Sequence, residues 1–196
     1  GKTAFGMTSE LITTASGAKF GKSEGNAVWL DEKLTSPYQF YQFWVRAEDA
    51  DVVRYLKLFT FIPLDEIGSL AEQVSSAPQQ RAAQKRLAHA MTEMVHGKAA
   101  ADTAVRASEV LFGSEIRDLS DNLISDIFSD VPSSAISADS LAQGIPIVDA
   151  LVPALAKSKS EARRLLQSGG VYLNNVRISD TDYKLTPKDL ASDHFI

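Results

Sequence analysis

Residues 36–113 carry apolar side chains at helical spacing, and this pattern constrains the fold more than any other feature of the chain. Ser36 followed by Pro37 favours a helix start, because serine caps free backbone amides and proline suits the first helical position. Farther along, Val52 and Leu56 recur at the spacing of one helical face. The sequence therefore predicts a mainly α fold.

Further helix ends are expected within this stretch. Asp49 is the predicted cap of the second helix, and Pro63 opens the third. The next helix is expected to run from about Pro78 to Val95, where Gly97 is placed to stop it. Another helix is expected over residues 98–112.

An aromatic cluster lies in the first two of these helices, and its members occur on most faces of the first one. Such a helix is deeply buried. Base stacking on RNA is the alternative, but the spacing favours core packing. The cluster comprises Tyr38, Tyr41, Phe43, Trp44 and Tyr55.

The remainder of the chain predicts a smaller module after a linker. Residues 114–145 are rich in Ser and Asp, which predicts one short helix over 122–128 and a linker beyond it. A helix is expected from Pro146 to Leu155, although Pro153 should end or bend it early.

Ser158 and Glu161 have the spacing of a capping box at the start of the next helix, which is expected to run to Gln167. Two short strands follow, and Asn174-Asn175 between them predicts a tight hairpin.

Two lysines near the start form a candidate phosphate-binding loop. Lys19 and Lys22 lie three residues apart, with Gly21 between them and Ser23 directly after. Ammonium groups bind phosphate oxygens as point charges, and glycine allows backbone conformations that other residues resist. Solvated surface lysines are the competing interpretation of this short motif.

Charge is distributed unevenly along the chain. The whole chain carries −5, yet residues 157–188 contain seven basic and three acidic residues, a net charge of +4 that leaves −9 elsewhere. A basic segment on an acidic body is typical of a local polyanion site, and an ordinary scatter of surface charges is the competing interpretation. The chain has no Cys, which excludes disulfides and thiolate metal sites. No apolar run approaches the roughly 20 residues of a membrane helix.

Several segments, in order along nearly the whole chain, resemble the bacterial-type tyrosyl-tRNA synthetases, which are class I aminoacyl-tRNA synthetases. Lys19-Phe20-Gly21-Lys22-Ser23 resembles the "KMSKS" loop of that class in its tyrosine form. The segments from Ser158 to Leu166 and from Gly169 to Asn175 are similar to an S-four-type RNA-binding module. Further similar segments are 35–44, 54–61, 81–85 and 95–97.

The resemblance implies a domain order. Residues 1–35 would end a Rossmann-type catalytic domain, 36–130 would form a helical anticodon-binding domain, and 131–145 a linker. Residues 146–196 would form a small α+β S-four-like module, truncated before the basic strand that normally closes it. The upstream His-rich signature and the amino-acid pocket lie outside this sequence.

The resemblance also implies the chemistry. Lys19 and Lys22 would stabilise the departing pyrophosphate of ATP, with Gly21 and Ser23 contacting phosphates, while Mg²⁺ accompanies ATP and no metal site belongs to the protein. RNA contacts would come from basic side chains. These are Lys159, Arg163, Arg164, Arg177, Arg81 and Lys85.

The resemblance implies that the complete protein is a homodimeric tyrosine–tRNA ligase that binds ATP, tyrosine and tRNA(Tyr) in the bacterial cytoplasm or an organelle matrix, without a membrane. This fragment alone is expected to be monomeric and inactive. One alternative is a synthetase-derived RNA-binding or splicing protein without ligase activity. Another is an interaction domain whose RNA contacts have decayed, which the net charge favours and Arg163, Arg164 and Arg177 oppose.

Overall fold

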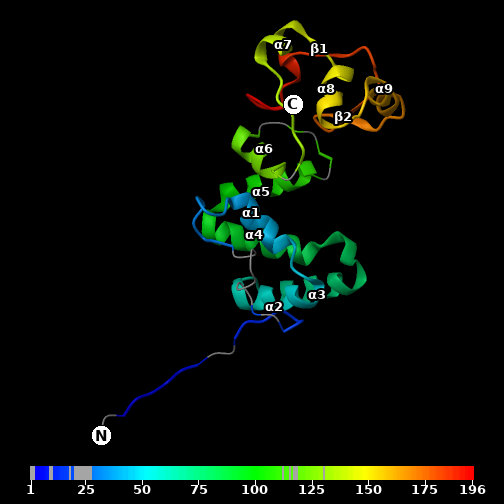
Figure 1. Cartoon of the computed structure of the whole chain (residues 1–196). Helices are drawn as coiled ribbons and strands as arrows, with labels where there is room; N and C mark the ends of the chain where they lie inside the picture. Colours follow the sequence, from blue (N-terminus) through cyan, green and yellow to red (C-terminus); the bar gives the residue numbers. More distant parts are fainter. Residues whose placement is uncertain are drawn as a thin grey trace. The chain divides into compact units, whose positions relative to one another are not determined.

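The chain folds into two compact units, residues 1–104 and 105–196, in a computed structural model (Figure 1). The structure describes residues 3–8, 11–17, 19, 28–111, 113–114, 116, 119–129 and 131–196. Most of these residues are helical, which confirms the predicted mainly α class.

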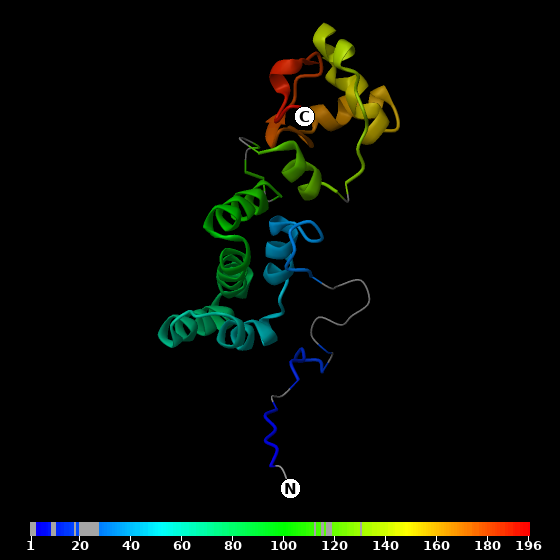
Figure 2. The same ribbon diagram turned by 90° about the vertical axis from the view of Figure 1, so that its left-hand side faces the viewer.

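The first unit is built around helix α4 (Figures 1 and 2). The helices α1, α2 and α3 all pack against α4, and α2 also packs against α3. The side chains of Phe40, Leu56 and Leu87 are almost fully buried and form part of the core. The helices of this unit are α1 (Pro37–Val45), α2 (Asp49–Phe59), α3 (Leu64–Ser76), α4 (Ala82–His96) and the first part of α5 (Lys98–Leu111).

The start of α1 follows the predicted chemistry. The Ser36 hydroxyl accepts a hydrogen bond from the Gln39 amide, and the Gln39 side chain accepts one from the Ser36 amide. This reciprocal pair is a capping box, with Pro37 at the first helical position. Gly97 (φ 87°) ends α4 as predicted, since that backbone conformation suits glycine.

Two predicted helix starts are wrong in detail. Glu48, rather than Asp49, is the N-cap of α2, and Asp49 is the first helical residue. The helix predicted from Pro78 is broken: Pro78–Gln80 forms one 3₁₀ turn, and Arg81 then adopts a left-handed conformation (φ 51°) before α4 begins. This conformation is uncommon for arginine, so a distant interaction must hold it.

The second unit combines short helices with two antiparallel two-stranded ribbons, in which β1 pairs with β4 and β2 with β3. It contains α6 (Asp121–Ile127), α7 (Ala138–Gln143), β1 (Ile145–Pro146), α8 (Ile147–Ala154), α9 (Lys159–Gln167), β2 (Val171–Leu173), β3 (Val176–Ile178), β4 (Lys184–Leu185) and a 3₁₀ turn (Pro187–Asp189). The helices α8 and α9 pack together. Their core includes Ile147, Leu151, Leu166 and Val171.

The predicted hairpin is confirmed. Asn174 and Asn175 both have positive φ, 49° and 65°, and connect β2 to β3. Positive φ at both central residues is the requirement of a type I′ turn, which matches the twist of the flanking strands.

Two other local predictions need correction, and a third, that Pro153 ends its helix early, is confirmed. The expected linker contains α7, whose N-cap Ser137 accepts a hydrogen bond from the Ser140 amide. Ser158 caps α9 as predicted, but the Glu161 carboxylate accepts from the Lys157 amide at 2.8 Å instead of closing the box on Ser158. Pro153 lies in the last turn of α8, which ends at the next residue.

Across the residues that the structure describes, none of the helices is both long and apolar enough to span a membrane.

Candidate nucleotide and RNA sites

Lys19 lies at the end of a tight turn. The Gly17 amide donates to the Thr14 carbonyl at 2.9 Å, and Gly17 has a φ of 84°, which favours glycine. The turn reverses the chain, so that Thr13 and Lys19 form an antiparallel bridge. Lys19 is exposed to solvent, as a residue that binds a phosphate from solution needs to be.

The turn is attached to α2 by two side chains. The Asp51 carboxylate accepts a hydrogen bond from the Ala15 amide at 2.7 Å, and the Arg54 guanidinium donates to the Thr13 carbonyl at 3.3 Å. Asp51 is only 3% exposed. Neither residue is recognisable from the sequence, because each has its partner more than 30 positions away in the chain.

The remaining predicted residues of the lysine loop, Gly21, Lys22 and Ser23, lie outside the described residues. Their roles stay predictions drawn from the motif.

Arg163 and Arg164 lie on the exposed side of α9. The opposite side of this helix buries Ala162 and Leu166 in the core of the unit. Both guanidinium groups are therefore presented to solvent by a helix that is fixed by packing.

Arg177 lies beside the C-terminal end of α9. Its guanidinium donates to the carbonyl of Ser168, the C-cap of that helix, at 3.3 Å. It also covers Gly169, where an added Cβ atom would come within 1.7 Å of the Arg177 Nη2. Arg177 pairs with Tyr172 across the hairpin, and both side chains are exposed, so the two share the solvent-facing side of the ribbon.

Lys159 is less available than these arginines. Its ammonium group forms an ion pair of 2.6 Å with Asp149 of α8. An RNA phosphate would have to compete with this carboxylate.

The two candidates in the first unit differ sharply. Lys85 is exposed on α4. The Arg81 guanidinium instead donates to the carbonyls of Val45 and Ala47, at 2.7 and 3.0 Å, at the end of α1. These bonds satisfy carbonyls that have no partner within α1, which gives Arg81 a structural task and explains its left-handed backbone.

Four residues of the aromatic cluster are part of the core, as predicted, and Phe43 is half-buried. Tyr38, Tyr41, Trp44 and Tyr55 are each at most 5% exposed. The ring of Trp44 packs edge-on against the ring of Phe43, with the centroids 5.2 Å apart.

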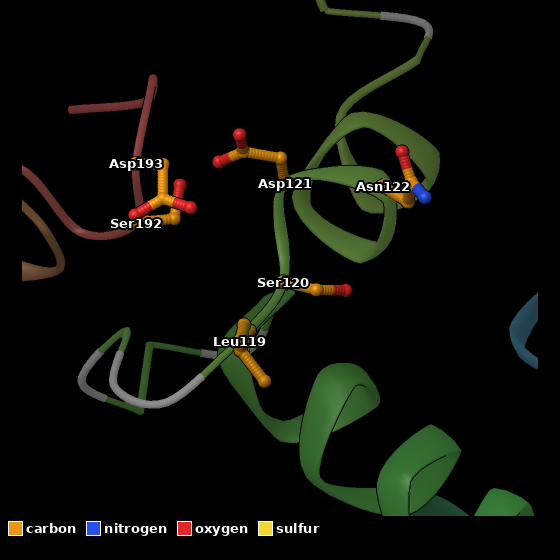
Figure 3. Close-up of a pocket in the computed structure, with 6 residues that line it drawn as sticks. All are labelled: Leu119, Ser120, Asp121, Asn122, Ser192 and Asp193. Carbon is orange, nitrogen blue, oxygen red and sulfur yellow. The ribbon is translucent and has the colours of Figure 1, made fainter.

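A pocket near the C-terminal segment is lined by Leu119, Ser120, Asp121, Asn122, Ser192 and Asp193 (Figure 3). Asp121 accepts a hydrogen bond from the His194 amide at 3.2 Å and also bonds the His194 ring. The nearby Ser192 hydroxyl and then the bond from His194 lower the pKa of Asp121, and the bond to Asp121 raises the pKa of His194. This pairing fixes the C-terminal segment to the start of α6.

No group of three or more His, Asp or Glu side chains within the described part of the chain is arranged to hold a metal ion.

Two family models match the chain in sequence order. The model described as "tRNA synthetases class I (W and Y)" matches residues 1–113, and "Tyrosine--tRNA ligase SYY-like C-terminal domain" matches residues 123–196.

Similar curated proteins carry consistent names. Tyrosine–tRNA ligase 1 of Bacillus subtilis (strain 168) is 45% identical over 196 residues, which is 100% of this chain and 46% of that protein. Tyrosine–tRNA ligase of Roseiflexus castenholzii is 47% identical over 191 residues, 96% of this chain and 45% of that protein. The chain thus spans about half the length of the curated relatives it matches.

Among solved structures, a C-terminally truncated mitochondrial tyrosyl-tRNA synthetase of Aspergillus nidulans is 45% identical, with a TM-score of 0.43. That match covers 44% of this chain and 26% of the other.

Proposed function

Because this chain belongs to the class I tRNA synthetases (W and Y), we propose that it is the C-terminal portion of a tyrosine–tRNA ligase. The family match bears out the resemblance drawn from the motifs. The choice of tyrosine rests on one observation: relatives that are 45–47% identical over 96–100% of the chain are tyrosine–tRNA ligases. The complete protein would couple ATP cleavage to charging of tRNA(Tyr).

Lys19 would act on ATP during the first step, in which the tyrosine carboxylate attacks the α-phosphate and pyrophosphate leaves. Negative charge grows on the departing phosphates, and a cation that engages them mainly in the transition state accelerates the step. The exposed position of Lys19 at the end of an anchored turn supports this role. Lys22, Gly21 and Ser23 would complete the loop, and Mg²⁺ would arrive bound to ATP.

The second unit would bind tRNA through an S-four-like module. Arg163 and Arg164 on α9 and Arg177 on the hairpin present cations from adjoining elements, an arrangement suited to phosphates of structured RNA. We place Arg163 and Arg164 first, because the cationic groups of Arg177, Lys159 and Arg81 have partners within the protein. Lys85 would add a contact from the helical anticodon-binding domain.

The complete protein would be a homodimer, because the family is dimeric through its catalytic domain. Bacterial relatives favour the bacterial cytoplasm as its location, with an organelle matrix as the alternative.

The test of the reaction is ATP–pyrophosphate exchange by the complete protein. We expect exchange with tyrosine and not with tryptophan, which separates the two specificities of the family. Lys19→Ala should lower kcat by about 100-fold with a smaller change in the KM for tyrosine, because a transition-state contact is removed. Exchange that depends on tryptophan, or a fully active Lys19→Ala variant, would contradict the proposal.

The test of RNA binding is the affinity for tRNA(Tyr) at a fixed salt concentration. The double variant Arg163→Glu/Arg164→Glu should weaken binding by at least about 10-fold, because repulsion replaces two phosphate contacts. Lys57→Glu, a charge reversal on the exposed face of α2, is the control. Normal exchange with tyrosine but no tRNA binding by the wild-type protein would favour an altered RNA target.

A further inference from the structure

We propose that Asp51 and Arg54 are positioning residues that fix Lys19 for the reaction of ATP. This inference rests on the proposed function of Lys19. The Asp51 carboxylate is almost completely buried. A buried charge lowers stability unless polar groups compensate it.

The compensation for this charge comes partly from the segment that carries Lys19. The Ala15 amide donates to Asp51 at 2.7 Å, a charge-assisted hydrogen bond of short length. Asp51 also lies in the first turn of α2, where the helix dipole favours an anion. The charge is thus stabilised by α2 on one side and by the turn on the other.

Arg54 makes a second attachment one turn later in α2. Its guanidinium donates to the Thr13 carbonyl at 3.3 Å, and Thr13 is the residue that bridges to Lys19. The two side chains therefore hold the turn at Thr13 and at Ala15. Gly17 closes the turn between Ala15 and Lys19.

The backbone of Lys19 is therefore held in position by α2, a helix that packs on both α3 and α4. A long lysine side chain has many conformations, and fixing its backbone reduces the volume that the ammonium group explores. Correct placement of a catalytic group contributes strongly to rate, and a misplacement of about 1 Å costs as much as about 100-fold.

Asp51 and Arg54 also act on the neighbouring Tyr55. Burial, followed by the negative charge of Asp51, raises the pKa of the Tyr55 phenol, and the positive charge of Arg54 opposes this rise. These three residues lie within one stretch of α2, and two of them, Asp51 and Arg54, bond the turn.

The experiment uses the complete protein and measures tyrosine-dependent pyrophosphate exchange. Asp51→Ala removes the acceptor for Ala15 and should lower kcat by about 10- to 100-fold while the KM for tyrosine stays within about 3-fold. Asp51→Asn keeps an acceptor oxygen and should restore most of the rate. Arg54→Ala, at an exposed position, should lower kcat by a smaller factor.

Asp49→Ala is the matched control. Asp49 lies in the same turn of α2, is itself exposed, and accepts a hydrogen bond at 2.5 Å from the buried Gln84 of α4. This variant should lower the melting temperature without changing kcat. A loss of rate in Asp49→Ala equal to that in Asp51→Ala would reduce Asp51 to a general structural residue and overturn the inference.

A second readout does not depend on activity. Hydrogen exchange in the peptide covering residues 11–19 should become faster in Asp51→Ala and remain unchanged in Asp49→Ala. Unchanged exchange in Asp51→Ala would show that the anchor does not hold the turn, which also overturns the inference.

Different results would contradict the proposed function and the anchoring role of Asp51. A wild-type protein with no tyrosine-dependent exchange would overturn the proposed function and, with it, the role of the anchor in catalysis. An active wild type together with a fully active Asp51→Ala variant would overturn the anchor alone.

Discussion

Asn175 joins the β2–β3 hairpin to the end of α5, and its removal should destabilise the second unit. The side-chain amide donates to the carbonyls of Val110 and Ser114, each at 2.7 Å. Val110 lies in the last turn of α5, and its carbonyl also accepts a hydrogen bond from the Gly113 amide at 3.1 Å. One side chain therefore satisfies acceptors that lie more than 60 positions away in the sequence.

The magnitude follows from these two hydrogen bonds. Each contributes about 0.5–1.5 kcal/mol net, so Asn175→Gly should lower the free energy of unfolding of this unit by about 1–3 kcal/mol. Glycine accepts the left-handed backbone at this position, so the substitution adds no strain. For a unit of this size, a loss of 2 kcal/mol lowers the melting temperature by about 8–16 °C.

Asn174→Gly is the matched control, because Asn174 has the same left-handed backbone and sits next to Asn175. Its side chain donates one hydrogen bond, to the Asp189 carbonyl at 2.7 Å. Its loss should therefore cost about half as much. Asn175→Asp keeps the size of the side chain but places a carboxylate beside two carbonyls, and it should destabilise the unit more than glycine does.

The assay is thermal unfolding followed by two signals. Both tryptophans, Trp29 and Trp44, lie in the first unit, so fluorescence reports that unit, whereas circular dichroism reports helices in both. Asn175→Gly should shift the circular-dichroism transition and leave the fluorescence transition in place. A shift in Asn174→Gly that equals or exceeds the shift in Asn175→Gly would contradict the stabilising role of the two Asn175 hydrogen bonds.

Three further perturbations test other contacts. Gly169→Ala should destabilise the second unit by about 1–2 kcal/mol, because alanine is strained at φ 71° and its methyl group displaces the Arg177 guanidinium; urea unfolding measures the loss. An NMR titration of His194 should give a pKa above 6.5, and this pKa should return toward 6.5 in Asp121→Asn. Because the pKa of His194 is raised in the folded state, the stability from this contact is complete below pH 6.5. That stability is lost as the pH rises through the folded-state pKa. Arg81→Leu should lower the free energy of unfolding of the first unit by about 1–3 kcal/mol, because the two hydrogen bonds that cap α1 are lost. If the variant instead remains fully folded and binds tRNA more weakly, Arg81 contacts RNA.

Features set by neighbouring residues were predictable from the sequence. Ser36 before Pro37 identifies the start of α1, and Asn174-Asn175 identifies the hairpin, because the capping hydroxyl and the turn amides act within a few positions. The helix α7 escaped prediction because its six residues lie in a segment rich in Ser and Asp, where composition favours a loop.

Features set by distant partners were not predictable. The residues near Arg81 in the sequence do not indicate that its guanidinium caps α1. The left-handed backbone of Arg81 interrupts a helix that the sequence predicts to be continuous from Pro78. The sequence indicates only that Asp51 is an acidic residue in the first turn of a helix. Its hydrogen bond with the Ala15 amide, 36 positions away, could not be predicted. Such pairings arise only after the helices have packed.

The helix α5 crosses the division between the two units, and this affects how the protein can be cut. The compact units separate after Ala104, whereas the matches to the two family models end at residue 113 and resume at residue 123. An expressed fragment that begins at 123 would lack Val110 and Ser114, the acceptors of Asn175. A fragment that begins near Val105 would keep both acceptors. The gap between the two family models is therefore a poorer place to divide the polypeptide than a position within α5.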